Sequence, residues 1–142
     1  MNLWQRKQTE LLGIKPKEIK IMKDIESRQD LELLMQTFYQ KLLKDEGVNY
    51  IFTDIAKINL EQHLPIITDF WEQNILNTGT YKNNVLKIHQ DLNGKVKLSE
   101  EHFSIWLRHF DQTVDTLFSG EKANTIKTRA LSIATVMKIK LT

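Results

Sequence analysis

Four polar side chains stand on faces of this chain that are otherwise apolar, and the histidines among them could hold a metal. The clearest case is VLKIHQDL, residues 85 to 92, where Val85, His89 and Leu92 share one face if the segment is helical. Desolvating an unpaired polar group costs ~1–3 kcal/mol, so an inward imidazole needs a partner. That partner is either another protein group or a metal.

The other three polar side chains are Tyr39, His63 and Trp106, which lie on three further segments. A zinc site takes three or four protein ligands, and only His63 and His89 are placed to face inward, so the set does not favour structural zinc. Haem iron needs one proximal histidine, an apolar slot and one or a few distal hydrogen-bond donors. Tyr39, His63, His89 and Trp106, with the apolar residues around them, match that requirement.

Several other kinds of chemistry are excluded by what the chain lacks. It has no cysteine, which removes disulfides, thiolate metal sites, iron–sulfur ligation, cysteine nucleophiles and covalent haem attachment through C-x-x-C-H. No P-loop, H-E-x-x-H, G-x-S-x-G or EF-hand pattern occurs, and 5 glycines are too few for a phosphate-cradling loop. The familiar hydrolase and nucleotide-binding solutions are therefore unsupported.

The elements that must position these residues are helices. Apolar residues recur at helical spacing, bounded by glycines, over residues 28–47, 59–79, 97–120 and 121–141. No strand alternation, internal repeat or low-complexity tract competes with this pattern. The expected fold class is therefore all-α, in one compact domain.

Two of these helices carry signals for where they begin. Ser99 is a good N-cap, and Leu98 and Phe103 are placed for a hydrophobic staple around it. In the second helix, Pro65 cannot donate a backbone hydrogen bond, so the regular helix is predicted to begin near His63 or to bend there.

Charge divides the chain into a basic N-terminal extension, residues 1–23, and a body, residues 24–142. The extension holds six Lys or Arg against two Glu, or +4, which leaves −2 on the body of a chain whose net charge is +2. A mildly acidic body argues against nucleic-acid binding, and no apolar run approaches the ~18 residues of a membrane span. Since no secretory signal is present, we expect a cytoplasmic, soluble protein.

The extension itself is either a docked helix or a loose arm. Its simplest interpretation is a solvated segment, with a membrane-surface or partner-docking role as the alternative.

In combination, the segments resemble the group III truncated haemoglobins of bacteria, over about residues 24 to 138. The matching stretches run in family order: DLELLMQTFYQKLLKD, NYIF, QHLPIITDFW, GTYKNNVLKIHQDL, HFSIWLRHFDQTVD and RALSIATVM. The resemblance implies a shortened globin fold, a 2-on-2 sandwich of helix pairs around a haem. The pairs would be residues 28–45 with 60–77 and residues 99–119 with 122–140.

The resemblance also implies the principal ligand roles. His89 is expected to be the proximal iron ligand, with its second ring nitrogen fixed by a carbonyl or water. Tyr39 and Trp106 are expected to be distal donors that face bound oxygen through a phenol O–H and an indole N–H.

Further pocket roles follow from the same resemblance. His63 is expected at the distal pocket entrance, with Ile67 one turn on against the ligand, and Phe52 at the porphyrin edge. The implied wall residues are Phe38, Trp71, Leu86, Leu92, Phe103 and Phe110. The remaining histidines, His102 and His109, are assigned to solvent or to the helix edge, without a ligand role.

Each assignment has a plainer alternative. A lone histidine on an apolar face, such as His89, is more often a satisfied core residue than a ligand. His63 could simply cap the helix that starts beside it. Tyr39 and Trp106 could be core aromatics with a polar handle.

The expected function is reversible oxygen binding by non-covalent haem b at five-coordinate iron. Two strong donors would make oxygen leave slowly, which favours storage, sensing or scavenging over rapid delivery. The alternative is an enzyme that reduces peroxide or converts nitric oxide to nitrate in the same pocket, and a reductase would keep the iron ferrous. A more distant alternative is a haem-free helical interaction domain. Neither nucleic acid nor a membrane is expected as a partner.

Overall fold

The computed structural model of the protein describes residues 2–4, 7, 22–79 and 85–141, without the side chains of residues 85–87. Every regular element among these residues is helical, and none is a strand. In chain order the elements are α2 (Arg28–Lys44), η2 (Ile51–Ile55), α3 (Leu60–Trp71), η3 (Glu72–Leu76), α4 (Val85–Asn93), α5 (Glu100–Leu117) and α6 (Glu121–Leu141), where η2 and η3 are π-helices. The predicted all-α class is confirmed.

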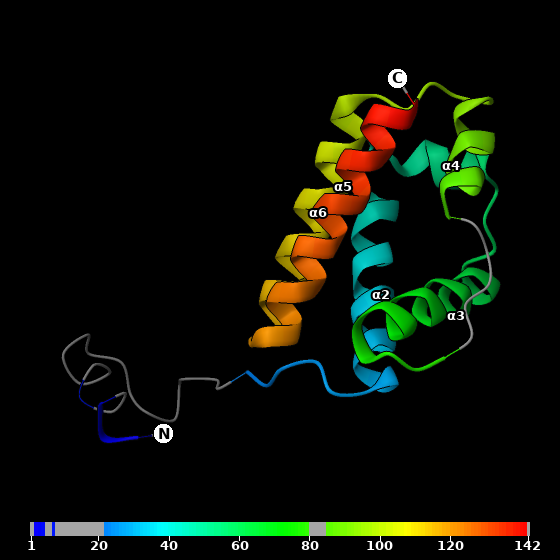
Figure 1. Ribbon diagram of the computed structural model, residues 1–142. Coiled ribbons are helices and arrows are strands. Elements are labelled where there is room, and N and C mark those ends of the chain that lie inside the picture. The colour runs from blue at the N-terminus through cyan, green and yellow to red at the C-terminus, as the bar shows by residue number, and fades with distance from the viewer. Residues whose placement is uncertain (1, 5–6, 8–21, 80–84, 142) are drawn as a thin grey trace.

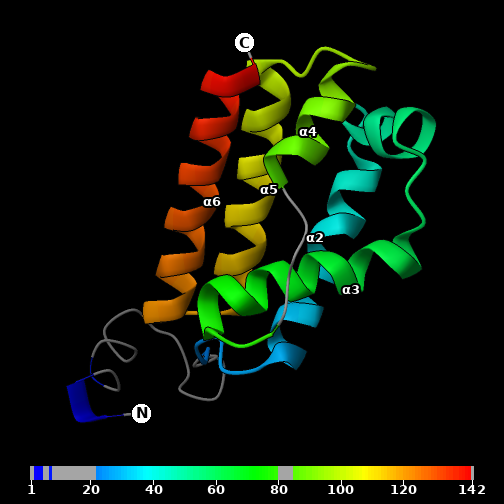
Figure 2. The same cartoon turned by 45° about the vertical axis from the view of Figure 1, so that its right-hand side comes forward.

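Two helix pairs form the body of the molecule. α5 and α6 lie side by side along their length, and α2 packs against α3, which crosses it (Figures 1 and 2). α2 also packs against α5 and so joins the two pairs, while α4 contacts α6. The pairs are those expected from the sequence. Among the helices described, none combines the length and apolar character that crossing a membrane requires.

Local hydrogen bonds explain why α2 and α5 begin where they do. Ser27 caps α2, and its own N–H donates to Asp30 Oδ2 at 3.2 Å, which completes a capping box. Ser99 caps α5, as predicted. In the box of α5 the usual acidic residue is replaced by His102, whose Nδ1 accepts from the Ser99 N–H at 3.0 Å.

Of the two alternatives predicted for α3, a start near His63 or a bend there, the structure excludes the start near His63. The helix begins at Leu60, as in the helix pair that the resemblance implies, and contains Pro65. The reason is a cap further upstream, because the Asn59 side chain accepts from the Gln62 N–H at 3.2 Å and organises the first turn before the proline. His63 therefore lies inside the helix and does not cap it.

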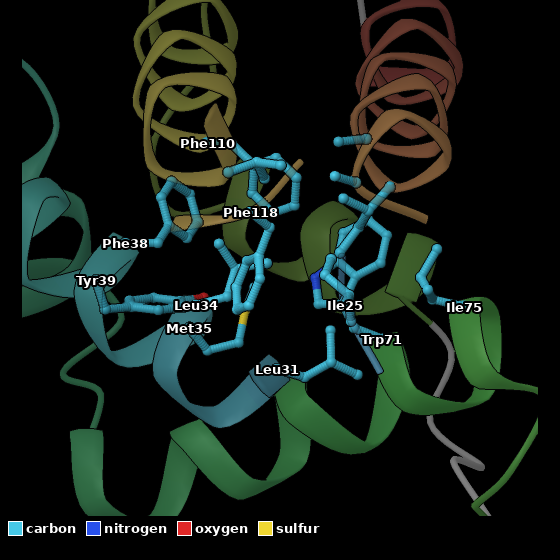
Figure 3. Close-up of a cluster of buried hydrophobic side chains, with 14 of the residues drawn as sticks. Ile25, Leu31, Leu34, Met35, Phe38, Tyr39, Trp71, Ile75, Phe110 and Phe118 are labelled. Atoms are coloured by element: carbon cyan, nitrogen blue, oxygen red, sulfur yellow. The ribbon is translucent and has the colours of Figure 1, made fainter. Parts of the chain in front are cut away.

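A buried cluster between α2, α3, α5 and α6 forms the main core (Figure 3). Its three largest fully buried side chains, Trp71, Phe38 and Phe110, are at most 2% exposed. A second cluster joins η2, the start of α5 and the end of α6, through Ile51, Leu98, Phe103, Ala134, Met137 and Leu141. Leu98 and Phe103 share this cluster, as the predicted staple requires.

Candidate functional site

Tyr39 on α2 and His63 on α3 meet in the interior although they are 24 residues apart. The Tyr39 Oη and His63 Nε2 atoms are 2.8 Å apart, and the two ring centroids are 5.1 Å apart at 76°. Tyr39 is only 5% exposed, and burial raises the pKa of its phenol. Tyr39 therefore keeps its proton at neutral pH and can act as a hydrogen-bond donor.

His89, on α4, belongs to the same region as His63. Burial, followed by the charge of His89, lowers the pKa of His63 below its ordinary value of 6.5. The imidazoles of His63 on α3 and His89 on α4 therefore interact electrostatically. His89 is itself half-buried and interacts with neighbouring groups. His63 is thus a predominantly neutral imidazole at pH 7.

Trp106, on α5, is held close to Tyr39 through one shared aromatic neighbour. The edge-to-face contact between Phe38 and Trp106 spans 5.5 Å between centroids, and that between Phe38 and Tyr39 spans 5.4 Å. Trp106 also stacks on Phe110 at 5.2 Å and 15°. Because Trp106 remains half-buried, part of its surface is not covered by protein.

Phe52 and Ile67 also lie beside this group. Phe52, in η2, contacts the Tyr39 ring at 5.9 Å and 82°. Ile67, one turn beyond His63 on α3, packs against the main core while staying half-buried. Three elements therefore contribute half-buried side chains to this group: η2, α3 and α5.

The expected wall residues fall into two groups. Phe38, Trp71 and Phe110 are completely buried in the main core. Phe103 lies in the second cluster, and Leu92 packs against that cluster. The side chain of Leu86 lies outside the described residues.

Two half-buried leucines were missed among the candidate lining residues. Leu64 packs against the main core beside His63, and Leu107 packs against both clusters beside Trp106. Leu107 lies in the apolar stripe of its helix, so its spacing predicted an inward position. Periodicity alone does not separate residues that line a site from residues of the core.

His102 and His109 were assigned to solvent or the helix edge, and the structure shows that both are half-buried and hydrogen-bonded. His109 has a side chain only 16% exposed, and its Nε2 lies 2.7 Å from Asp45 Oδ2. His102 is half-buried, and its Nε2 lies 2.9 Å from Tyr50 Oη. Both partners come from the segment after α2, which the sequence does not place against α5.

The described residues do not form a complete binding site for a free metal ion. In the described ranges, no three His, Asp or Glu side chains converge closely enough to hold one. The imidazoles of His63 and His89 could supply one or two ligands, which suits a metal carried by a cofactor.

Comparisons with known proteins define the family. The chain is 32% identical over 111 residues to the group 3 truncated haemoglobin ctb of Campylobacter jejuni, covering 76% of this chain and 85% of that protein. A crystal structure of a group III truncated haemoglobin from Campylobacter jejuni superposes with a TM-score of 0.77 at 27% identity, covering 86% of this chain and 96% of that one. No model of a known protein family matches the chain.

The chain belongs to the group III truncated haemoglobin family. Its helix order and the pairing of α2 with α3 and α5 with α6 are those of the truncated globin fold.

Proposed function

We propose that the chain binds haem through His89 and holds oxygen, or another diatomic ligand, on the side of Tyr39, His63 and Trp106. The observation that carries the proposal is the partly buried 2.8 Å hydrogen bond between Tyr39 and His63, together with the effect of His89 on the pKa of His63. Membership in the truncated haemoglobin family supports the choice of haem. Because the chain has no cysteine, the haem would be held without covalent bonds, as haem b.

The half-buried residues expected at the site fit such a group. His89 supplies a half-buried imidazole from α4. Phe52, Ile67, Leu92 and Trp106 are half-buried, so each keeps apolar surface that a flat macrocycle would remove from water. Phe38 and Phe110 would support the pocket from behind, since the protein itself covers them fully.

When bound, haem iron would supply a coordination position and the electron density that gives a diatomic ligand partial negative charge. Tyr39 and Trp106 would donate hydrogen bonds to that charge. Each charge-assisted bond is worth about 1.5–3 kcal/mol, or roughly 10- to 150-fold in the rate of ligand dissociation. The apolar side chains beside the bound haem would exclude water, which would otherwise compete for these donors.

His63 would control the Tyr39 hydroxyl. With its proton on Nε2, His63 donates to Tyr39 Oη, which leaves the phenol O–H free to donate to a ligand. With its proton on Nδ1, His63 accepts the phenol O–H and withholds it. We assign the first tautomer to the ligand-bound protein.

Haem uptake tests the proposal directly. Purified protein given haem is expected to develop a Soret band, and His89→Ala is expected to lose or rearrange it. Gln90→Ala is the matched control, because Gln90 is the next residue of α4 and is exposed. No uptake by the wild type, or unchanged proximal coordination in His89→Ala, would contradict the proposal.

A second candidate function is an enzymatic one, peroxide reduction or nitric oxide conversion, with a reductase as the electron source. It is favoured by the lowered pKa of His63, because a neutral imidazole beside the ligand site can accept a proton from peroxide. Turnover of peroxide or nitric oxide by the haem-loaded protein decides between the two functions. Rates no higher than those of free haem would rule out the enzymatic function and leave ligand binding as the function.

A further inference from the structure

A mostly buried hydrogen bond ties the end of α2 to the middle of α5. Asp45 is the C-cap residue of α2, and its Oδ2 lies 2.7 Å from His109 Nε2. The two side chains are 22% and 16% exposed. Arg108 also approaches the same oxygen, but at 3.4 Å and with a side chain 56% exposed, so its contact is weaker and screened by water.

The protonation state of this link follows from its chemistry. The hydrogen bond from His109, assisted by the Gly47 N–H, lowers the pKa of Asp45 against the effect of burial. An ionised carboxylate can only accept, so His109 Nε2 carries the proton and donates. The bond therefore persists whether His109 is neutral or doubly protonated.

Packing alone does not explain a histidine at position 109. Its Nδ1 atom is buried and has no hydrogen-bond partner among the described residues. A leucine would fill a similar volume without the cost of that unpaired nitrogen. The gain that offsets this cost is the bond to Asp45.

The link joins the same two helices that carry the proposed distal donors. Tyr39 is on α2, six residues before Asp45, and Trp106 is on α5, three residues before His109. In the described part of the chain, every hydrogen bond between α2 with its cap and α5 ends on the Asp45 carboxylate. The rest of this contact is apolar and aromatic packing, such as Phe38 on Trp106, which fixes position less strictly than a hydrogen bond does.

We propose that His109 is a positioning residue for the distal pocket. Through Asp45 it fixes the register of α2 against α5, and with it the place of the Tyr39 hydroxyl relative to the Trp106 indole. This inference rests on the proposed function, in which those two groups act together on one ligand.

Three variants separate positioning from simple packing. His109→Leu removes the donor and keeps the volume, whereas His109→Gln places an amide N–H near the position of Nε2 and should restore the link. Arg108→Gln is the matched control, since it removes the exposed partner of the same carboxylate.

The main measurement is the C–O stretching band of the ferrous, haem-loaded protein with carbon monoxide, which responds to nearby donors. His109→Leu is expected to shift or split the band and to speed oxygen dissociation roughly tenfold, as for one weakened charge-assisted bond. His109→Gln and Arg108→Gln are expected to match the wild type. A merely structural contact would lower the midpoint of urea unfolding without moving the band, so a folded His109→Leu with the wild-type band and rate refutes the proposal.

A second measurement does not depend on haem. In the full chain labelled with ¹⁵N and free of haem, the indole N–H resonance of Trp106 is expected to shift in His109→Leu and to stay in place in Arg108→Gln. If the wild type takes up no haem, the proposed function fails while this measurement still tests the link. An unmoved Trp106 resonance in His109→Leu shows that His109 does not position the indole.

Discussion

Tyr39 combines two features that suit the proposed donor role: a buried phenol, whose pKa that burial raises, and a hydrogen-bonded imidazole beside it. A tyrosine used only for packing needs none of these beyond burial. The pair thus explains why a polar residue occupies an inward position next to Phe38.

Removing the Tyr39 hydroxyl should weaken ligand retention. In the haem-loaded protein, Tyr39→Phe is expected to speed oxygen dissociation roughly 10- to 150-fold, because one charge-assisted hydrogen bond is lost. Stopped-flow displacement of oxygen measures this rate. Tyr50→Phe is the control, since Tyr50 also bonds a histidine, His102, at 2.9 Å. Equal oxygen dissociation rates in the two variants would show that Tyr39 does not donate a hydrogen bond to the ligand.

The lowered pKa of His63 predicts a pH dependence of stability in the haem-free chain. The unfolded chain binds a proton at His63 more readily than the folded chain does. His63 therefore does not lower the stability of the fold above about pH 6.5, but it destabilises the fold as the pH falls from there through its folded pKa. Between pH 7.5 and pH 5, the free energy of urea unfolding should therefore fall more in the wild type than in His63→Gln. The same loss in both proteins would mean that His63 is not responsible.

At the scale of elements, the start of α6 is organised from far away in the chain. Asp24 accepts hydrogen bonds from the Lys122 and Ala123 N–H groups, each at 2.8 Å. Gly120, at φ +144°, makes room for this, because a Cβ there would lie 2.5 Å from Asp24 Cγ. Burial raises the pKa of Asp24, but these backbone N–H groups outweigh it, and the net pKa is lowered.

Loss of this cap should destabilise the fold. Asp24→Ala is expected to reduce the free energy of unfolding by about 1–2 kcal/mol, the usual cost of removing a helix-capping oxygen. Urea unfolding at pH 7 measures it, with Glu26→Ala as the control because the Glu26 side chain is 68% exposed. If the two variants are equally stable, Asp24 does not cap α6.

Most helix boundaries were predictable because caps and apolar stripes are local. The start of α5 at Ser99 is an example, since an N-cap bonds within its own first turn. The start of α3 is less evident from local signals, because the Asn59 cap favours a start at Leu60 whereas Pro65 favours a later one. The π-helices η2 and η3 were not predictable, since the extra residue in such a turn leaves no clear mark on apolar spacing.

At the scale of the whole molecule, the division between an extension and a globin domain stays a prediction. The structure shows where a truncation must stop, because Lys23 already contacts the body. Its carbonyl accepts from the Ser119 N–H at 3.0 Å, and its Nζ lies 2.7 Å from Asp30 Oδ2. Ile25, two residues on, is 1% exposed in the main core.

Two truncations test the division. Residues 22–142 are expected to fold, to take up haem, and to unfold with a free energy within about 1 kcal/mol of the full chain. Residues 26–142 lose the Asp24 cap and the buried Ile25, so we expect a loss of about 3–5 kcal/mol. Circular dichroism with urea unfolding measures both. A shorter chain as stable as the longer one, or a longer one that does not fold, would place the boundary elsewhere.

The sequence by itself determined the helices and the short list of polar residues on apolar faces, Tyr39, His63, His89 and Trp106. Both follow from short-range physics, namely apolar spacing, capping and the cost of burying an unpaired polar group. Only the tertiary structure decided which of these groups meet. The Tyr39–His63 bond and the Asp45–His109 link join residues 24 and 64 positions apart, and such contacts depend on how α2 packs against α3 and α5. No local pattern records that packing, which is why His109 was assigned to the helix edge and was found to link two helices.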